Sequence, residues 1–287
     1  MCTNTLPFYE FNEGLYEIDE FDCVSVFVIV GTERALVLDT GTGIGDLRWV
    51  IENRITDKPY DVVLSHNHGD HAGGAGFFDT VWIHKNDADW NTPGTAPTLE
   101  FRKEYAGLIR RREHKYYRYS EESDIRPWPK EPQKKMLKDG TSFFLGGRTV
   151  TFYHCPGHTD GECVALDNLT HTLLTGDACN NNLLLGSASG TGVRDCIHTA
   201  EESLRRIASM HDMYEDAYNS HHDFRGFGQP LDPLVLPDVL ACLSDLYDMK
   251  AQFTTVPDAL SAAGKTKTVA VRNEVQISFM NKDIRYY

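Results

Sequence analysis

The chain has 287 residues, 41% of them hydrophobic, which is enough for a sizeable core and excludes a disordered chain. Its 28 Lys and Arg residues against 42 Asp and Glu give a net charge of −14, which disfavours binding of nucleic acid or of an anionic membrane by the whole surface. No apolar run predicts a membrane span, the acidic start lacks the pattern of a signal peptide, and seven scattered cysteines are typical of free thiols, so we expect a cytoplasmic protein.

The first predicted elements are a hairpin of buried strands and a helix. Apolar residues at 24–30 and 35–39 predict two paired strands, and the second strand ends on Asp39. Residues 47–55 fit a helix. The G-T-G-I-G segment at 41–45 follows a strand, as a dinucleotide fingerprint does, but its last spacing is G-x-G, so we expect a flexible turn there.

An insertion is predicted at about 85–140, where prolines surround a helical pattern over residues 98–119. Between Phe101 and Lys138 the chain carries 12 Lys or Arg against 6 Asp or Glu, a local balance of +6 (12 − 6). The insertion is therefore a basic addition to an acidic protein.

The second half of the chain repeats the strand pattern of the first. A strand at 149–153 is followed by apolar runs at 163–166 and 172–177, which predict another hairpin. This hairpin ends on Asp177, as the earlier one ends on Asp39. The two hairpins are weak evidence of an internally duplicated sheet architecture.

The last predicted element is a helix at about 234–253, where apolar residues recur at helical spacing. Strands that alternate with helices indicate an α/β layered fold, whose sites lie in loops after strand ends. We expect a single domain over residues 1–287, with a helical extension at about 230–287.

The apolar D-V-V-L at 61–64 predicts a short strand, and the segment S-H-N-H-G-D-H directly after it contains three histidines and an aspartate. His66 and His68 are two residues apart, so an extended backbone puts both on one side, and the turn at Gly69 directs Asp70 and His71 to another. Neutral imidazole and carboxylate are ligands that zinc prefers. The segment can therefore supply ligands to two adjacent metal ions.

Further metal donors lie in loops after other strand-like runs. His158 lies in C-P-G-H-T-D-G, Asp177 ends T-L-L-T-G-D, and His221 lies in Y-N-S-H-H-D. The neighbouring His222 remains an alternative to His221 as the last donor. With the earlier donors they form two predicted sets and a bridge: His66, His68 and His158; Asp70, His71 and His221; and Asp177 between them.

The order H-x-H-x-D-H, P-G-H-T, T-G-D and a late histidine resembles the metallo-β-lactamase superfamily of hydrolases over about residues 20–225. The resemblance implies a four-layer αβ/βα sandwich with the site at one edge of two facing sheets. It also implies that Asp39 supports the metal-binding loops. The cofactors it implies are two divalent ions, with Zn²⁺ expected and Fe or Mn as alternatives.

Two adjacent ions lower the pKa of a bridging water toward neutrality, so we expect a metal-bridging hydroxide as the nucleophile. Asp70 is the expected catalytic residue, because it can both bind metal and orient or relay the proton.

The resemblance implies that Asp177 replaces the serine or cysteine of true β-lactamases, which disfavours antibiotic hydrolysis. The A-C-N-N-N that follows lacks the tyrosine of lactone-cleaving members, which disfavours a strict quorum-signal lactonase.

The basic insertion leaves three interpretations open. As a lid, Arg110, Arg111, Arg112 and Tyr116 would hold a small anionic ester, thioester or lactone. The same residues could hold nucleic acid for phosphodiester cleavage, or they could form a solvated helix face. Because the rest of the protein is acidic, we expect a small-molecule substrate, with a phosphodiesterase as the alternative. A β-lactamase or a non-enzymatic metal-dependent binding protein ranks lower, no membrane partner is expected, and a homo-oligomer is left open.

Overall fold

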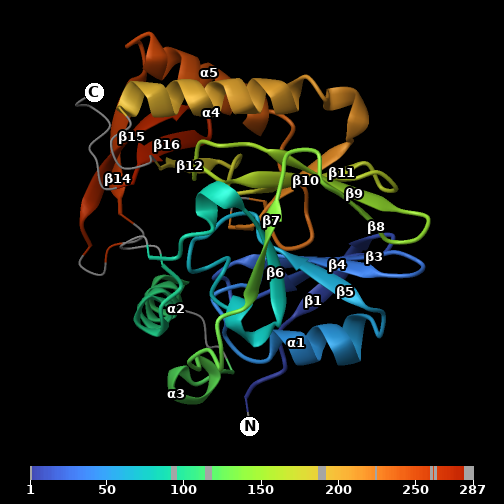
Figure 1. Ribbon diagram of the computed structural model, residues 1–287. Coiled ribbons are helices and arrows are strands. Elements are labelled where there is room, and N and C mark those ends of the chain that lie inside the picture. Colours follow the sequence, from blue (N-terminus) through green and yellow to red (C-terminus); the bar gives the residue numbers. More distant parts are fainter. Residues whose placement is uncertain are drawn as a thin grey trace.

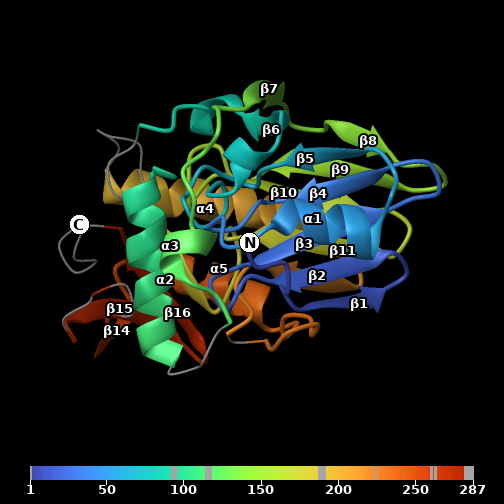
Figure 2. The same cartoon turned by 90° about the horizontal axis from the view of Figure 1, so that it is seen from below.

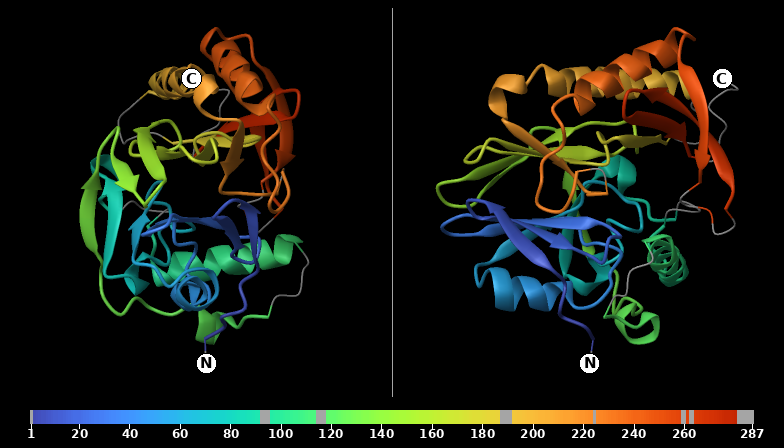
Figure 3. Two further views of the ribbon diagram at one scale, coloured as in Figure 1. Left: turned by 90° about the vertical axis from the view of Figure 1, so that its right-hand side faces the viewer. Right: turned by 180° about the vertical axis from the view of Figure 1, so that it is seen from behind.

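The protein is a layered arrangement of helices and sheets (Figure 1). The computed structural model describes residues 2–91, 96–113, 118–186, 192–223, 225–258, 261 and 264–280. Helices α4 (Val193–Ala208) and α5 (Val235–Tyr247) cover one outer face, and α1 (Leu47–Val50), which continues as a π-helical turn at Ile51–Ile55, covers the other. The two views in Figure 3 show the same order of helix, sheet, sheet and helix.

The first sheet has seven strands that lie side by side in chain order from β1 to β7. The predicted hairpin is confirmed, because β3 and β4 pair antiparallel and Val30 lies opposite Ala35. From β4 onward the neighbours run parallel. The strands are β1 (Phe8–Asn12), β2 (Leu15–Asp19), β3 (Ser25–Val30), β4 (Ala35–Leu38), β5 (Tyr60–Val63), β6 (Thr80–His84) and β7 (Gln133–Leu137).

The second sheet has five strands in the order β13-β11-β10-β9-β8. The second predicted hairpin is confirmed as well, because β10 and β11 pair antiparallel and Asp167 lies opposite Thr172. β13 then runs parallel to β11, so both strands end at the same edge. The strands are β8 (Ser142–Phe144), β9 (Thr149–His154), β10 (Cys163–Asp167), β11 (Thr172–Gly176) and β13 (Asp216–Asn219).

The third sheet, in the order β12-β16-β15-β14, corrects the prediction of a helical extension over 230–287. Only α5 is helical there among the described residues, and it ends at Tyr247. The chain after it contains V-Q-I-S-F and T-K-T-V-A-V-R, in which β-branched and polar residues alternate as in strands. The strands are β12 (Asn182–Leu185), β14 (Gln252–Pro257), β15 (Thr266–Arg272) and β16 (Val275–Phe279).

The buried side chains form three clusters that separate the layers. In β10, Val164 and Leu166 face α4 and α5, whereas Cys163 and Ala165 face the seven-stranded sheet. A strand that is buried on both faces has a continuous run of apolar residues, which explains the apolar run at 163–166. The predicted four-layer αβ/βα sandwich is confirmed.

The predicted insertion contributes both helices and a strand. Its elements are the 3₁₀ turn η3 (Lys85–Asp87), α2 (Leu99–Glu113), α3 (Glu121–Asp124) and β7, so its last part joins the main sheet. Of the helix predicted over 98–119, residues 114–117 lie outside the described residues, and residues 118–119 are not helical. Figure 2 shows α2 on the side of the molecule that also carries β14 and β15. Two further 3₁₀ turns occur at η2 (Ala75–Phe77) and η4 (His211–Met213).

Two absences predicted from the sequence can be compared with the structure. All seven cysteines have free thiols. In the part of the chain that the structure describes, no helix combines the length and the apolar character that crossing a membrane requires.

Candidate metal centre

The seven predicted metal ligands converge where strands of the two larger sheets end. The loop after β5 carries the first four, and the segments after β9, β11 and β13 carry one each. Six of the residues are buried, and the side chain of the seventh, His221, is 22% exposed. The set is His66, His68, Asp70, His71, His158, Asp177 and His221.

The ligand atoms form two groups of three. In each group the atoms lie within 4.8 Å of one another: His66, His68 and His158 in one, and Asp70, His71 and His221 in the other. The Oδ2 atom of Asp177 lies 3.6 Å from Nε2 of His158, 3.4 Å from Nε2 of His71 and 3.2 Å from Nε2 of His221. Asp177 therefore lies between the two groups.

Asp39 orients two of the buried imidazoles. Its carboxylate accepts hydrogen bonds from the backbone N–H of Ser65 at 2.7 Å and from the Ser65 hydroxyl at 2.9 Å, and it lies 3.0 Å from Nδ1 of His71. Because a carboxylate only accepts, Nδ1 of His71 carries a hydrogen, so Nε2 is the atom that can bind a metal ion at the centre. Ser65 Oγ in turn lies 2.9 Å from Nδ1 of His66, so that Nε2 of His66 also points inward as an acceptor.

The carbonyl of Leu184 orients a third imidazole. Nδ1 of His158 donates to this carbonyl at 2.6 Å, which leaves Nε2 of His158 as an acceptor. That Nε2 lies 2.9 Å from Nδ1 of His68. In the absence of metal, a neutral His68 with its hydrogen on Nδ1 donates to this Nε2. The contact therefore brings ligand atoms of His158 and His68 together, as a shared metal site requires.

Three acceptor atoms of the centre are buried without a hydrogen-bond partner among the described residues, namely Nε2 of His66, Nε2 of His71 and Oδ1 of Asp177. An unsatisfied buried polar atom costs about 1–3 kcal/mol. A divalent cation would satisfy these acceptors, and a mixture of imidazole and carboxylate suits zinc, iron or manganese. The residues present therefore fit a pair of divalent ions.

The two groups differ in their charge. Burial, with neighbouring imidazoles, lowers the pKa of His66 and His68 well below the usual value. Burial also disfavours a charged His221, but the carboxylates of Asp177 and Asp70 outweigh it and raise the pKa of His221 to about 9. Although burial acts to raise it, the pKa of Asp177 is held well below its usual range, first by His221. A proton thus takes the place that a metal ion fills among the carboxylates.

His221, rather than His222, faces the centre. Nδ1 of His222 lies 3.0 Å from the hydroxyl of Ser25, and its Nε2 lies 3.3 Å from Oδ1 of Asp22. Both contacts direct this ring toward the β2–β3 connection. The structure thus brings His221 together with the other candidate ligands and leaves His222 outside the group.

The predicted substrate contacts lie on α2 and beyond its end. Arg110 donates to the carbonyl of Tyr119 at 2.7 Å, and its guanidinium lies 4.0 Å from the centre of the Tyr119 ring. Arg111 is exposed, and the side chains of Arg112 and Tyr116 lie outside the described residues. Arg110 is therefore used in the packing of the insertion itself.

The loop at 41–45 is held in place and is not the flexible turn that we expected. The carboxylate of Glu20 accepts from the N–H groups of three consecutive loop residues at 2.5 to 2.8 Å. Burial raises the pKa of Glu20 to about 7, although these N–H groups act to lower it. From α2, the buried Arg102 donates to the carbonyl groups of Thr42 at 2.6 Å and Gly43 at 2.9 Å.

Two aromatic residues of the insertion also contact the ligand loop. A Cβ atom on Gly69 would lie 2.4 Å from the ring of Phe101, so only glycine leaves room for this ring. Nε1 of Trp128 donates to the carbonyl of Gly73 at 2.7 Å. The insertion is therefore anchored to the loops that carry the candidate ligands.

Asp87 is a buried carboxylate behind the centre that the sequence did not reveal. Its Oδ2 accepts from the hydroxyl of Thr159 at 2.6 Å, and backbone N–H groups of Gly161 and Asn67 also hydrogen-bond to it. Burial raises its pKa to about 6. Asp87 thus joins the loop before His68 to the loop around His158.

Glu162 is the second buried carboxylate that sequence reasoning missed. Its Oε1 accepts from the backbone N–H of Asp177 at 3.0 Å, and its Oε2 lies 3.2 Å from Nδ1 of His66. Burial, and then the charge of Asp177, raise the pKa of Glu162 well above its usual value. The only signal in the sequence was an acidic residue directly before an apolar strand.

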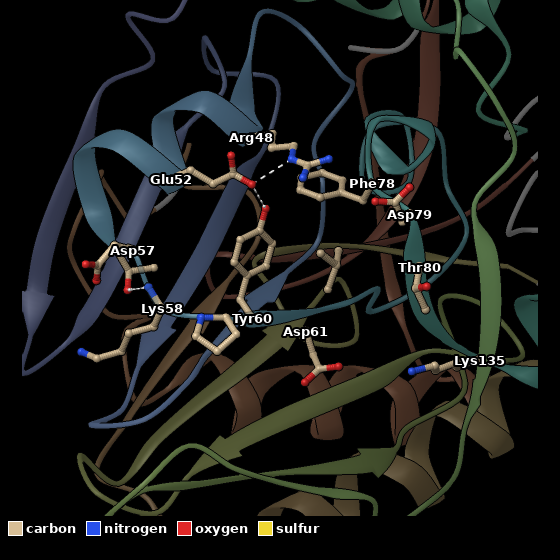
Figure 4. A pocket seen from close by; sticks show the side chains of 13 residues that line it. Arg48, Glu52, Asp57, Lys58, Tyr60, Asp61, Phe78, Asp79, Thr80 and Lys135 are labelled. Carbon is tan, nitrogen blue, oxygen red and sulfur yellow. Dashed lines mark hydrogen bonds and ion pairs between the residues drawn. The ribbon is translucent and has the colours of Figure 1, made fainter.

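A hollow of about 720 Å³ lies away from the centre, at the opposite ends of the parallel strands (Figure 4). Its lining contains no histidine or cysteine among the described residues. Several of its charges are already paired: Arg48 lies 2.8 Å from Glu52, and Asp61 and Asp79 pair with Arg34 and Lys130 outside the lining. The size of this hollow therefore does not make it the functional site.

The sandwich and the site at its edge define a hydrolase class. Residues 20–183 match a family model described as the metallo-beta-lactamase superfamily. This chain belongs to that superfamily, and it is a hydrolase with groups of His and Asp residues that could hold metal ions.

Curated relatives include thioesterases. The acyl-coenzyme A thioesterase MBLAC2 of Homo sapiens is 22% identical over 206 residues, which cover 64% of this chain and 68% of that protein. The atrochrysone carboxyl ACP thioesterase of Emericella nidulans is 29% identical over 188 residues, which cover 64% of this chain and 47% of that protein.

Solved structures show the same fold. A metallo-beta-lactamase family protein from Thermus thermophilus is 21% identical with a TM-score of 0.54, and the match covers 84% of this chain and 80% of that one. A B3 metallo-beta-lactamase with an active-site glutamic acid is 17% identical with a TM-score of 0.57, covering 85% of this chain and 90% of that one.

Proposed function

We propose that this protein is a binuclear metal-dependent thioesterase that hydrolyses an acyl thioester of a carrier such as coenzyme A or an acyl carrier protein. The observation that carries the proposal is the carboxylate of Asp177, which lies 3.2 to 3.6 Å from imidazoles of both ligand groups. Relatives named as acyl-coenzyme A and ACP thioesterases support the choice of substrate class.

In this proposal each ion takes three residues, and Asp177 is shared. When bound, the two divalent ions supply a water of lowered pKa and polarise the carbonyl oxygen of the substrate. The side chains that hold them are His66, His68 and His158 for one ion, Asp70, His71 and His221 for the other, and Asp177 for both. Asp39 and Leu184 keep the imidazoles in the tautomers that metal binding needs.

Asp70 is the proposed proton carrier. Its Oδ2 lies 3.6 Å from Nε2 of His221 and 3.8 Å from Nε2 of His71, and its side chain is 11% exposed. A carboxylate at the open side of the centre can accept the proton of the attacking water and release it to solvent.

The chemistry of the leaving group favours a thioester. All seven candidate side chains are used as ligands, and the one proposed proton carrier among them, Asp70, passes its proton to solvent, so no separate proton donor in this set serves the leaving group. A thiol has a pKa of about 8.5, so a thiolate leaves without being protonated first. An alkoxide or an amine leaving group needs a general acid, which makes an ester or an amide a poorer fit.

Metal analysis combined with a substrate panel tests the proposal. Protein loaded with zinc, iron or manganese should hold two equivalents and release free thiol from acyl-coenzyme A, detected with a thiol reagent. Its kcat/KM for this substrate should exceed that for a lactone, a bis-aryl phosphodiester and a cephalosporin by at least about tenfold, or 1.4 kcal/mol. The result overturns the thioesterase if the phosphodiester is preferred, since that outcome supports the phosphodiesterase alternative.

Adjacent histidines provide a matched control. His221→Ala should lose one metal equivalent and at least about 100-fold of activity, because it removes a proposed ligand. His222→Ala should keep both equivalents, since its ring contacts Ser25 and Asp22 instead. Equal loss of metal in both variants, or full activity after complete metal removal, contradicts the proposed binuclear centre.

A further inference from the structure

A second hollow lies on the outer face of the five-stranded sheet, behind the metal centre. It has a volume of about 450 Å³ and lies between the end of α4, the start of α5 and the strands β11 and β13. Small-molecule pockets have volumes of about 300–1,000 Å³. The hollow is therefore large enough for a small ligand.

The interior of this hollow is apolar. Aliphatic side chains from β10, β11, α4, α5 and the loop before α5 line it, and they belong to the core cluster beneath the helices. The main ones are Val164, Leu173, Leu204, Ile207, Leu231 and Leu240. A hydrocarbon chain suits this lining, because its apolar surface is buried there and the chain carries no polar group that needs a hydrogen-bond partner.

The mouth of the hollow is acidic. Glu215, Asp216 and Asp232 are exposed there, and the lining described by the structure includes no Lys or Arg. His211 also lines the hollow, and it lies 3.1 Å from the carboxylate of Asp212, which offsets its charge when it is protonated. In the described part of the chain, the carboxylates of Glu215 and Asp216 have no ion-pair partner. An anionic head group is disfavoured at this mouth, and a cationic one is attracted.

The wall of the hollow also includes the back of the turn that carries Asp177. Thr175 and Cys179 line it, and the hydroxyl of Thr175 donates to the carbonyl of Cys179 at 3.0 Å. Thr175 follows Leu173 by two residues, so its side chain points to the helix-covered face of the sheet. The hollow is thus separate from the edge where the ligand loops meet.

We propose that this hollow binds a small aliphatic amine, with its chain among the leucines and its ammonium group at the acidic mouth. This site is independent of the proposed thioesterase reaction, because it uses neither the metal ligands nor the substrate. A fatty acid with the same chain is rejected, since its carboxylate would meet Glu215 and Asp216.

The test compares n-octylamine, n-octanol and n-octanoate by calorimetry on the metal-loaded protein at pH 7.5. Octylamine should bind to one site per chain, octanol about tenfold more weakly, and octanoate more weakly still. Glu215→Gln combined with Asp216→Asn should reduce the affinity for octylamine about tenfold and leave that for octanol unchanged. A matched change elsewhere, Glu202→Gln on α4, should leave all affinities unchanged.

A second pair of variants tests the location. Ala208→Phe places a ring in the hollow and should abolish binding, whereas Ala241→Phe, on α5 outside the lining, should not. Binding should persist in His221→Ala, which separates this site from the metal centre. The proposal is overturned if octanoate binds as tightly as octylamine, if no probe binds, or if the double charge variant behaves like the parent.

Discussion

Replacing Asp39 by asparagine tests how the protein prepares the centre for metal. The three nearest donors to this carboxylate are the N–H and the hydroxyl of Ser65 and Nδ1 of His71, at 2.7, 2.9 and 3.0 Å. Asparagine has one oxygen and one NH₂ group, so it cannot accept from all three. If its oxygen faces the N–H of Ser65, its NH₂ group faces the hydrogen on Nδ1 of His71.

The conflict is relieved when His71 moves its hydrogen to Nε2, but Nε2 is the atom that faces the centre. The lone pair needed for metal is then occupied. Hydrogen bonds to charged groups contribute about 1.5–3 kcal/mol each, and about 1.4 kcal/mol corresponds to a tenfold change in affinity. We therefore expect Asp39→Asn to weaken metal binding by about 10–100-fold, which is also the usual cost of losing a partner behind a metal ligand.

Competition with a chromophoric chelator at pH 7.5 measures this change for each metal equivalent. Ser220→Ala is the matched control, because the Ser220 hydroxyl lies 3.4 Å from Asp39 and is its most distant partner. The control should change affinity by less than about threefold, or 0.7 kcal/mol. Circular dichroism of the metal-free proteins separates loss of metal from loss of fold. If Asp39→Asn binds both equivalents as tightly as the parent, the tautomer argument is wrong.

Three further predictions concern residues around the centre. Burial, and then the stacked ring of His154 whose centre lies 4.0 Å away, lower the pKa of His84 to about 4. Unfolded histidine binds its proton near pH 6.5, so this pair should lose stability as the pH falls from about 6.5 to 4, and His84→Asn should flatten that part of the urea-unfolding profile by about 1–2 kcal/mol. Asp87→Ala should weaken metal binding about tenfold in the same chelator assay, whereas the exposed control Asp89→Ala keeps its backbone carbonyl and should not. Arg110→Ala should lower the free energy of unfolding by about 1 kcal/mol without raising KM for acyl-coenzyme A, and a raised KM at unchanged stability would favour the substrate-lid interpretation.

Local patterns of the sequence were sufficient to predict the two hairpins and the segment that carries four of the candidate metal ligands. The strands around Asp39 and Asp177 are buried on both faces, so their apolar runs are continuous and end where the polar loop begins. The histidines at 66, 68 and 71 lie within six residues, so backbone geometry alone brings them together. These features depend on neighbours along the chain, which a single sequence displays.

Contacts between distant segments were decided only by the tertiary structure. Asp87 and Thr159 are 72 residues apart, and Arg102 and Thr42 are 60 apart. No local pattern marks such a carboxylate or guanidinium as buried, because its partners are backbone and hydroxyl groups without a sequence motif. For the same reason the sequence left the last candidate ligand open. His221 and His222 are adjacent in sequence, and only their contacts in the folded chain distinguish them. The strands after α5 stayed hidden for a related reason, since β16 pairs with β12, which lies far earlier in the chain. Sequence periodicity thus predicts which residues can form an element, whereas the partner that satisfies its polar groups is known only once the chain has folded.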